Sequence, residues 1–558
     1  MFAACAAVLG LAFAGFAAPD PANSHEVVVY GASSAGVTAA TQAARMGHDA
    51  VLIAPDGHIG GMTSSGLGQT DTGPVETIGG LAREFYERVY EHYRADGAWT
   101  REERADYLSM GPGEHEWYFP VGRDRPWTRA WTDGMAFTFE PHVAREVFDA
   151  MLAEAGVAVV SGERLDLDPD RGVVMEDGAI RAVVMESGRA FEGRVFIDAT
   201  YEGDLMAAAG VDYIVGREGN APHGETLNGV QTANAVNHQF QDGVDPYMEP
   251  GNPDSGLLPG VDPAGPGAEG AGDHRVQAYC FRMCLTDVEE NQIPFSKPAG
   301  YDELEYELLF RNFEAGEDVV PLHPARMPDR KTDTNNHRAV STNWVGRNYA
   351  WAEGDYETRE RLYEGHKRYQ QGLMWTLANH PRVPRHIREE ASRWGYAKDE
   401  FEDAGHWPPQ LYIRVARRMV GGYVVTEDVV QGAADAPDPV AMGGYQMDSH
   451  NVQRYVDADG HARNEGDVQV GAPGPYPISY RAIVPPREAV SNLIVPVAVS
   501  ATHIAYGSIR MEPVFMKLGH AAGAAAAHAI RGDVAVQDVA YEPLRESLLA
   551  SGQVLPDP

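Results

Sequence analysis

The sequence predicts an α/β protein with a discontinuous Rossmann-type nucleotide-binding domain and an inserted α+β domain. Residues 25–54 have the strand, turn, helix and strand pattern that opens such a nucleotide-binding domain. Near the end of the chain, an apolar strand-like run at 493–500 and an Ala-rich helical run at 513–530 resume it. Between these parts, residues 301–420 are richer in charged and aromatic side chains. The nucleotide-binding domain therefore starts, is interrupted, and closes near the C-terminus.

The opening unit consists of short, strongly patterned runs. Residues 25–31 (HEVVVYG) are rich in Val and end in glycine, which predicts a strand followed by a tight turn. Residues 33–46 place Ala, Thr and Val at helical spacing, and Gly47 suits the position after a helix. Residues 50–54 (AVLIA) predict a second buried strand, which completes a β-α-β unit.

The middle of the chain predicts further elements and the domain limits. Helices are expected at 141–155, 355–378 and 385–395; strands at 157–160, within 172–198 and at 195–199; turns at 177–178 and 187–188; and a long loop at 245–273. We divide the chain into a leader (1–24), a nucleotide-binding domain (25–85, 141–216 and 481–535), a substrate or cap domain (86–140 and 217–480) and a C-terminal tail (536–558).

Charge and cysteine content limit the partners. The 558 residues include 81 acidic and 45 basic ones, a formal net charge of −36. Such a surface repels nucleic acid, so no nucleic-acid partner is expected. Cys280 and Cys284 lie four residues apart in a strand-like run, about 13 Å along an extended chain. That separation is too long for a disulfide, so we expect two buried thiols and no metal site.

An apolar run begins the chain. Residues 2–18 (FAACAAVLGLAFAGFAA) have the length of a signal-peptide core, although the usual basic residues before it are missing. We expect export to a periplasmic or extracellular location, with an uncleaved anchor as the alternative. No other run reaches 18 apolar residues, so no membrane span is expected in the mature chain.

The first strand-to-helix turn is a candidate phosphate site. Gly31 permits a tight turn and Gly36 permits close packing of helix on strand. Ser33 stands where the fingerprint G-x-G-x-x-G has its middle glycine, and its hydroxyl is a candidate donor to phosphate. Ser34 and Ala35 open the helix, whose free amides favour a pyrophosphate.

The residue that would hold a ribose is less clearly marked. An acid is expected at the end of the second strand, but Ala54 stands there. Asp56 is our candidate for the ribose contact, and a backbone contact is the alternative. A literal G-x-G-x-x-G at 265–270 follows no strand and contains Pro266, so we interpret it as a loop. No second nucleotide fingerprint appears, and no bound nicotinamide coenzyme is expected.

Three further segments are candidate ligand contacts. Small residues at 60–68 allow backbone to approach a flat ligand; the candidates are Gly60, Gly61, Met62 and Thr63. Asp204 lies at the start of a predicted helix, where it suits a ribityl or ribose hydroxyl or serves as a helix-end charge. Residues 501–513 join the last strand to the Ala-rich helix; they place His503, Arg510, Met511 and Glu512 near the positive end of that helix.

Several of these segments together resemble a known family. GASSAGVTAATQAARMG, HIGGMTSSGLGQTD, FIDATYEGDLMAAAG, KTDTNN and SATHIAYGSIRMEPVFMKLGHAAGAAAA are similar to FAD-dependent oxidoreductases often labelled xanthan lyases. The similarity extends over residues 25–535 and is most specific at IRMEPVFM. It implies the glutathione-reductase-type fold and FAD bound by Gly31, Ser33, Gly36, Gly60, Gly61, Met62, Asp204 and residues 503–519. It gives no substrate, although a sugar or uronic-acid-like molecule is suggested.

An enzyme of this kind needs a base and substrate contacts. His503 is our first candidate base and His450 the second, with Arg510 stabilising charge. Arg414, Arg417 and Arg418 are candidate carboxylate ligands, or partners of the many acids. The segment 331–337 is dense in donors and acceptors, so Asn335 and Asn336 suit a polyol, unless the segment is a capped turn.

The predicted reaction is hydride transfer from a small hydroxylated substrate to flavin N5, followed by reoxidation by O₂, a quinone or another acceptor. Two alternatives stay open. A redox-neutral, flavin-assisted elimination on a carbohydrate would need no external acceptor. A non-catalytic binding protein would keep the fold and lose the chemistry.

Overall fold

The computed structural model describes residues 23–109, 131–132 and 134–557. The predicted signal segment at 2–18 lies outside these residues. Within the described part, none of the helices combines the length and apolar character that crossing a membrane requires.

A parallel sheet forms the base of the molecule. Its strands run in the order β25 (Leu493–Ile494), β9 (Val195–Asp198), β1 (Val27–Tyr30), β2 (Ala50–Ala54) and β5 (Ala158–Ser161). The register places the last residue of β1 beside the ends of β9 and β2. The carboxyl ends of three strands therefore meet at one edge, where open α/β sheets bind ligands.

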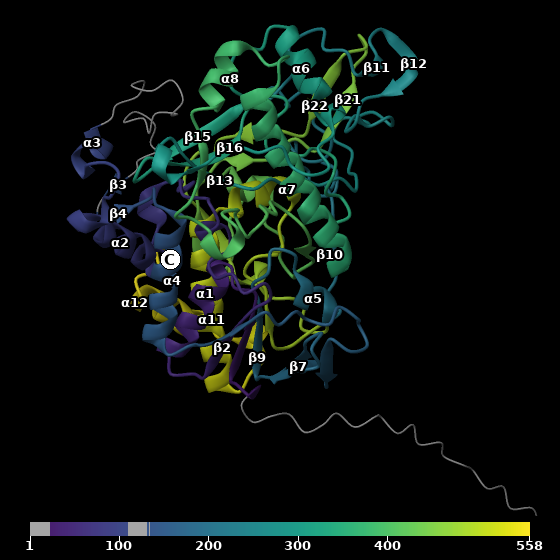
Figure 1. The fold of residues 1–558 in the computed structure, drawn as a ribbon. Helices are drawn as coiled ribbons and strands as arrows, with labels where there is room; N and C mark the ends of the chain where they lie inside the picture. Colours follow the sequence, from purple (N-terminus) through teal and green to yellow (C-terminus); the bar gives the residue numbers. More distant parts are fainter. Residues whose placement is uncertain (1–22, 110–130, 133, 558) are drawn as a thin grey trace, which may run out of the picture.

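The start and the end of the chain pack together on this sheet. Helix α1 (Ser34–Arg45) lies along α11 (Glu512–Gly532), and Figure 1 shows these purple and yellow elements side by side. A Cβ placed on Gly519 would lie 2.1 Å from the Ala35 carbonyl oxygen, and one on Gly523 would lie 2.3 Å from that of Ala39. Glycine thus allows the two helix backbones to touch. This contact confirms the fold class, in which the nucleotide-binding domain is discontinuous.

Several predicted elements around the sheet are confirmed. Helix α4 (Pro141–Ala155) has the predicted bounds and, with α2 (Gly80–Arg94), packs beside α1. An antiparallel sheet joins β6 (Val173–Glu176), β7 (Ala179–Val184) and β8 (Ala190–Glu192). The turn between β6 and β7 is the predicted Asp177-Gly178 pair. Both residues have positive φ, of 50° and 78°, which matches a type I′ hairpin.

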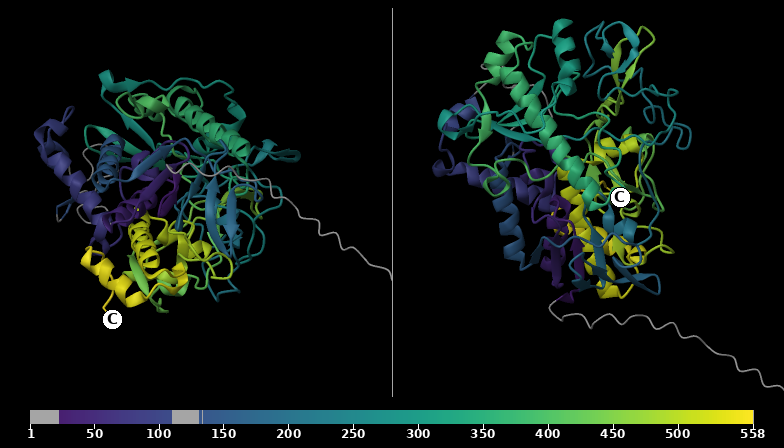
Figure 2. Two further views of the ribbon diagram at one scale, coloured as in Figure 1. Left: turned by 90° about the horizontal axis from the view of Figure 1, so that it is seen from below. Right: turned by 45° about the vertical axis from the view of Figure 1, so that its right-hand side comes forward.

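The inserted part contains an antiparallel sheet covered by helices. Its strands run in the order β14 (Gln292–Ile293), β17 (Gly395–Ala397), β13 (Met283–Thr286), β16 (Lys331–Asn336) and β15 (Leu322–Met327). The helices are α6 (Glu307–Glu314), α7 (Tyr356–Asn379) and α8 (Arg385–Ala391). Figure 2 shows the long green α7 extending from this upper part toward the parallel sheet. The α+β architecture predicted for the insertion is confirmed.

Three local expectations differ from the structure. Residues 331–336 form β16 and not a capped turn, because ion pairs allow the polar side chains of Lys331 and Asp333 to be buried in a strand. The predicted loop at 245–273 contains a hairpin of β11 (Tyr247–Glu249) and β12 (Asn252–Leu257). The segment expected as a tail forms α12 (Tyr541–Ala550), because buried Leu544 and Leu548 pack it against the protein.

The two inner cysteines follow the prediction. Cys284 lies in β13 and Cys280 lies just before it, and both are buried free thiols. Burial raises the pKa of the Cys284 thiol well above its ordinary value.

Short elements complete the described chain. The remaining helices are η2 (Gly61–Ser64), η3 (Val75–Thr77), η4 (Asp96–Ala98), α3 (Arg104–Ser109), α5 (Asp204–Ala208), η5 (Glu289–Asn291), η6 (Glu303–Tyr306), η7 (Glu402–Ala404), α9 (Glu427–Val430), η8 (Tyr480–Ala482), α10 (His503–Ile509) and η9 (Val536–Asp538). The remaining strands are β3 (Trp131–Thr132), β4 (Met135–Ala136), β10 (Tyr213–Ile214), β18 (Arg418–Met419), β19 (Pro439–Gly443), β20 (Met447–Asp448), β21 (Gln453–Val456), β22 (Ala462–Glu465), β23 (Gln469–Val470) and β24 (Tyr476–Ser479).

Candidate functional site

The β1–α1 turn has the shape of a phosphate-binding turn. Gly31 has φ +100°, and a Cβ there would lie 2.6 Å from the Ala199 carbonyl carbon. A Cβ on Gly36 would lie 2.0 Å from the Gly31 oxygen. The Ser33 hydroxyl donates to the Ala199 carbonyl at 2.6 Å and accepts from the Gly36 amide. The Ser33 hydroxyl is therefore engaged within the protein, and the groups at this turn that suit a phosphate are the amides of the first turn of α1, at Ser34 and Ala35.

A cavity of about 280 Å³ lies at the carboxyl edge of the parallel sheet. Gly31, Ser33 and Asp56 line its sheet side, while Trp351 and Arg359 of the inserted part line the other. Asp56 lies two residues beyond β2, and its exposed carboxylate pairs with Arg164 at 2.9 Å. Its place on the cavity wall is compatible with the predicted ribose contact.

Asp204 also lines the cavity, but arginines hold its carboxylate. Arg359 of α7 donates to it at 2.6 and 2.8 Å, and Arg417 donates at 2.8 Å. Burial raises the pKa of Asp204, yet the two guanidinium groups outweigh burial and lower it below the ordinary value. Asp204, which follows β9, thus links the parallel sheet to α7 through its ion pair with Arg359.

Glu512, in the first turn of α11, connects the glycine-rich loop that contains Thr63 with the start of α1. Its buried carboxylate accepts from the hydroxyls of Ser34 at 2.5 Å, Thr63 at 2.8 Å and Tyr201 at 2.9 Å. The Tyr201 hydroxyl also accepts from the Met62 amide at 2.9 Å. Four residues predicted from the sequence are therefore brought together. Tyr201, which joins them, was missed because an aromatic residue after a strand carries no local signal of this role.

The glycine pair of this loop fits against the phosphate turn. Gly60 and Gly61 have φ of 97° and 54°, and a Cβ on Gly61 would lie 2.3 Å from the Tyr201 hydroxyl and 3.0 Å from the Ser33 Cα. Gly61 lines the cavity, so this close backbone approach shapes its wall.

A second buried cluster surrounds Tyr412, near the junction of α10 and α11. The guanidinium carbons of Arg414, Arg510 and Arg282 lie 4.6, 5.6 and 6.0 Å from the centre of its ring. Arg510 also donates to the Tyr412 hydroxyl at 2.6 Å. Three cations therefore share one aromatic ring, an arrangement that favours anionic groups nearby.

Two of these three arginines have carboxylate partners. Arg282 makes two bonds of 2.6 Å to Asp333, and Arg510 lies 3.0 Å from Asp448. Arg414 donates only to the Ala278 carbonyl and to the Cys280 sulfur. Within the described residues, no carboxylate lies within ion-pair distance of Arg414.

His450 lies next to this cluster. Its Nδ1 is 3.2 Å from the Asn343 side-chain nitrogen, and its Nε2 is 3.7 Å from the Asp448 carboxylate. Burial and then the charges of Arg414 and Arg510 lower the pKa of His450 well below its ordinary value. Burial raises the pKa of Asp448 to about 6, although Arg510 opposes the rise. The imidazole is therefore neutral at neutral pH.

His503 is connected to His450 by hydrogen bonds. Gln277 joins them: its Nε2 is 3.2 Å from the His503 Nε2, and its oxygen accepts from the His450 amide. Burial and then Arg418 lower the pKa of His503 to about 3.

Met511, another predicted ligand contact, is buried directly before α11.

The other predicted substrate residues are dispersed. Arg417 pairs with Asp204 and Arg418 with Glu218, so these arginines do not form one cluster with Arg414. They lie in an extended segment, where successive side chains point in different directions. Asn335 and Asn336 lie at the end of β16. Within the described residues, the Asn336 Nδ2 is buried without a protein partner.

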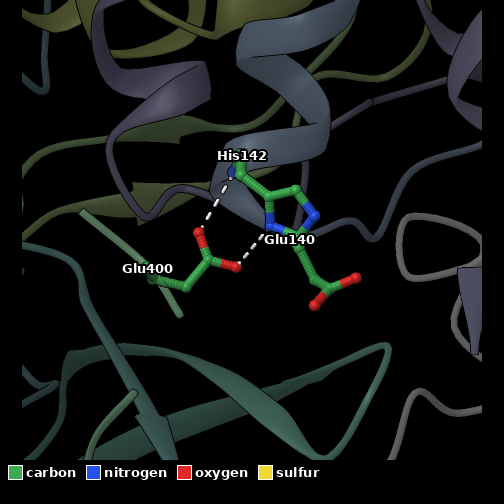
Figure 3. Close-up of side chains that lie close together, drawn as sticks. All are labelled: Glu140, His142 and Glu400. Carbon is green, nitrogen blue, oxygen red and sulfur yellow. Dashed lines mark hydrogen bonds and ion pairs between the residues drawn. The ribbon is translucent and has the colours of Figure 1, made fainter. Parts of the chain in front are cut away.

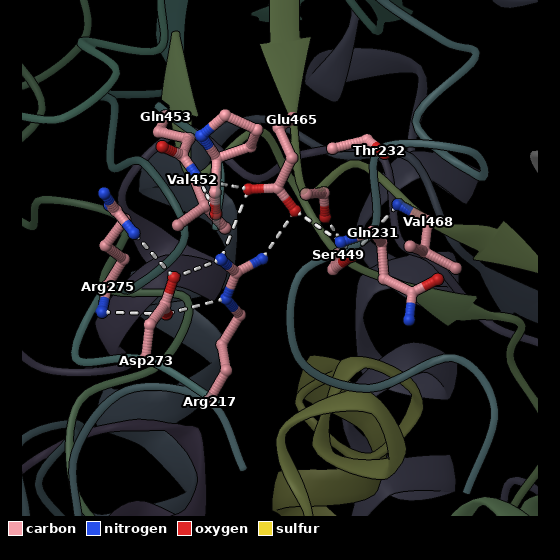
Figure 4. A network of polar contacts seen from close by, with 12 residues as sticks. Arg217, Gln231, Thr232, Asp273, Arg275, Ser449, Val452, Gln453, Glu465 and Val468 are labelled. Carbon is pink, nitrogen blue, oxygen red and sulfur yellow. Dashed lines mark hydrogen bonds and ion pairs between the residues drawn. The ribbon is translucent and has the colours of Figure 1, made fainter. Parts of the chain in front are cut away.

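An ion network holds the loop that carries His450. Arg217 pairs with Asp273 at 2.6 Å and with Glu465 at 2.8 Å, and Arg275 extends the network from Asp273 (Figure 4). The Glu465 carbonyl accepts from the Val452 amide, and the Glu465 carboxylate accepts from Gln453. The network is thus connected to the chain just after His450.

A further group has the composition of a metal site but already contains a cation. Glu140, His142 and Glu400 place their ligand atoms within 4.8 Å of one another (Figure 3). The buried Lys331 ammonium lies 2.7 Å from Glu140, 2.7 Å from Glu400 and 3.0 Å from Asp399. Because Lys331 supplies the positive charge, we interpret this group as structural.

Comparison with known proteins gives one extended match. A family model described as FAD dependent oxidoreductase matches residues 26–548, and no curated protein matches. Solved structures match in part. OxyS anhydrotetracycline hydroxylase from Streptomyces rimosus is 14% identical, with TM-score 0.22 over 35% of this chain and 36% of that one. L-proline dehydrogenase from P. horikoshii is 15% identical, with TM-score 0.23 over 36% and 59%.

These structural likenesses are limited. The chain spans between 35% and 59% of the length of the first three solved structures that it matches. These matches therefore indicate no particular activity for this chain. The family model is described as an oxidoreductase and not as a lyase. The family model, in contrast, covers nearly the whole described chain, including the phosphate turn, the Tyr412 cluster and α11. The chain belongs to the FAD-dependent oxidoreductase family.

Proposed function

We propose that this enzyme oxidises a small hydroxylated substrate by hydride transfer to FAD. The observation that supports the proposal is a set of buried polar atoms around His450 with no hydrogen-bond partner among the described residues: Asn343 Oδ1, Asn451 Oδ1 and Arg414 Nε. Buried polar atoms are nearly always satisfied in folded proteins. A hydroxylated ligand offers both donors and acceptors and would satisfy them.

The described residues fit FAD. Gly31 and Gly36 form a turn with no room for side chains, and the start of α1 offers amides to a pyrophosphate. The cavity of about 280 Å³ suits the adenosine end of FAD, and Asp56 on its wall is a candidate to contact the ribose. The start of α11 would hold the flavin end beside Arg510. FAD, when bound, supplies a hydride acceptor at N5.

The protein's own part in the reaction is to bind the alcohol and accept its proton. His450 is neutral because its pKa is depressed. Its Nε2 faces Asp448 at 3.7 Å, so the carboxylate would stabilise the imidazolium after proton transfer. We assign the base to His450. His503 serves as a neutral neighbour, because no carboxylate among the described residues lies within ion-pair distance of it, whereas Asp448 faces His450.

We also propose that the enzyme is exported. The apolar run at 2–18 supports this location. The net charge of −36 suits a protein that stays soluble in a salty medium. Mass spectrometry of secreted or periplasmic protein would test it: a mature N-terminus just after the Ala17-Ala18 pair is expected, and intact protein confined to the cytoplasm would contradict the proposal.

The reaction is tested by anaerobic mixing of the FAD-loaded protein with a panel of sugars, polyols and hydroxy acids. Loss of visible flavin absorbance would identify a substrate. The His450→Gln variant should reduce flavin about 10²- to 10⁴-fold more slowly, as expected for loss of a general base. The His503→Gln variant should be much less affected. Turnover without any acceptor would instead favour elimination, and failure to take up FAD would favour a non-catalytic protein.

A further inference from the structure

We propose that the substrate of this enzyme carries a carboxylate and that Arg414 binds it. This inference deepens the proposed oxidation, because it names the group that orients the hydroxylated substrate. The carboxylate would lie beside Tyr412, between the inserted part and the start of α11.

The first observation is a buried guanidinium without a counter-ion. The side chain of Arg414 is 1% exposed, and no carboxylate among the described residues lies within ion-pair distance of it. A buried charge is strongly unfavourable unless another charge compensates it. The neighbouring cations differ, since Asp333 neutralises Arg282 and Asp448 neutralises Arg510. Arg414 therefore retains an unmatched positive charge.

The second observation is the free edge of this guanidinium. Its Nη1 donates to the Ala278 carbonyl, whereas its Nη2 meets only the Cys280 sulfur at 3.2 Å, a weak acceptor. Its Nε is buried and has no partner in the described part of the chain. The Nε and Nη2 groups lie on the same edge, which is the edge that binds a carboxylate through two parallel hydrogen bonds.

The charge of the surroundings favours a singly charged anion. Asp71 adds a carboxylate to the neighbourhood, where it accepts from the Tyr445 hydroxyl at 3.0 Å. Burial raises the pKa of Asp467 to about 8, and the nearby charge of Asp448 adds to the rise, so this carboxyl stays largely protonated at neutral pH. Arg414 is the one of the three guanidinium groups around Tyr412 without a carboxylate of the described residues in direct contact. With carboxylates already nearby, a singly charged carboxylate suits this position better than a phosphate dianion.

The test compares matched ligands on the FAD-loaded enzyme. Dissociation constants for glucuronate and glucose, for gluconate and sorbitol, and for glucose 6-phosphate are measured under anaerobic conditions from changes in flavin absorbance and by calorimetry. The wild type should bind each carboxylate at least about tenfold more tightly than its neutral partner, as a charged hydrogen bond implies. Equal affinities, or a preference for the phosphate, would overturn the inference.

Variants assign the effect to Arg414. Arg414→Met and Arg414→Lys should weaken carboxylate binding and leave neutral ligands unchanged, with the lysine variant less affected. Arg454→Met is the matched control: Arg454 is also buried without a carboxylate of the described residues within ion-pair distance, but its Nε and Nη2 edge is occupied by Asn464 and Ala339. It should keep the preference. If Arg414→Met changed only the flavin midpoint potential, Arg414 would serve the flavin and the inference would fail.

The outcome also separates the two proposals. Carboxylate binding without flavin reduction by any ligand would support Arg414 as an anion site and contradict the proposed oxidation. Flavin reduction by neutral polyols, with no preference for acids, would support the oxidation and contradict the carboxylate site.

Discussion

Single buried charges in this protein differ in whether another side chain balances them. Lys331 is fully buried and contacts three carboxylates, those of Glu140, Asp399 and Glu400. Those contacts raise the pKa of Lys331 although burial alone would lower it. Arg414 is equally buried and has no such partner among the described residues. The contrast supports a structural role for Lys331 and the proposed ligand contact for Arg414.

Replacing Lys331 should therefore destabilise the protein without affecting the ligand. We expect Lys331→Met to lower the free energy of unfolding by about 3–5 kcal/mol, because it leaves buried carboxylates unpaired. Lys398→Met, at an exposed lysine that bonds the Glu290 carbonyl, should change it by less than about 0.5 kcal/mol. Chemical denaturation of both variants measures this. A Lys331→Met protein as stable as the wild type would contradict the assigned role.

The same group predicts a pH dependence through His142. Burial lowers the pKa of His142, but its hydrogen bond to Glu400 and the nearby carboxylates outweigh burial and raise it to about 9. An unfolded histidine titrates near pH 6.5. The stabilisation is thus complete below pH 6.5 and is lost as the pH rises through about 9. Melting temperatures across this range should fall less steeply for His142→Gln, and a parallel profile would refute the linkage.

At the scale of elements, the contact between α1 and α11 depends on glycine. A helix normally gains stability when Ala replaces Gly. At Gly519, however, a Cβ would lie 2.1 Å from the Ala35 oxygen and 2.3 Å from the Thr38 hydroxyl. Since Ala35 belongs to the first turn of α1, separation of the helices would also displace the phosphate turn.

We therefore expect Gly519→Ala to destabilise the protein by about 1–3 kcal/mol, as overpacking does, and to weaken FAD binding. Gly532→Ala is the control in the same helix, because its Cβ would meet nothing closer than 3.4 Å. Unfolding curves and flavin fluorescence titrations measure the two effects. Normal FAD affinity in Gly519→Ala would show that the turn does not depend on this contact.

Local elements could be predicted from the sequence, whereas the joins between them could not. The Gly31 turn, α4 and the Asp177-Gly178 hairpin are specified by neighbouring residues, so their patterns are visible. The pairs Arg282–Asp333 and Arg359–Asp204 join positions 51 and 155 residues apart. No local spacing encodes such pairs. For the same reason, the arginines at 414, 417 and 418 were predicted to cluster although each has a different set of partners.

At the scale of the whole molecule, the cavity proposed to hold part of FAD lies between the parallel sheet and the inserted part. Its walls come from the β1–α1 turn on one side and from α7 and the loop before it on the other. Arg359 of α7 connects the two parts by pairing with Asp204 of α5. A ligand in this cavity contacts both parts, so binding should stabilise them together.

The position of this cavity predicts how FAD and stability are coupled. Bound FAD should raise the melting temperature of the whole chain, which should unfold in one transition. At a free FAD concentration of 100 times Kd, the free energy of unfolding should increase by about 2.7 kcal/mol. Arg359→Met should weaken FAD binding and shrink this shift, because Asp204 loses its link to α7 and keeps only Arg417. Arg361→Met is the matched control, since Arg361 lies on the same helix and contacts Glu357 and Thr358 of that helix. Calorimetry with and without added FAD distinguishes the cases. If Arg359→Met bound FAD as tightly as Arg361→Met does, α7 would cover the cavity without contributing to cofactor retention.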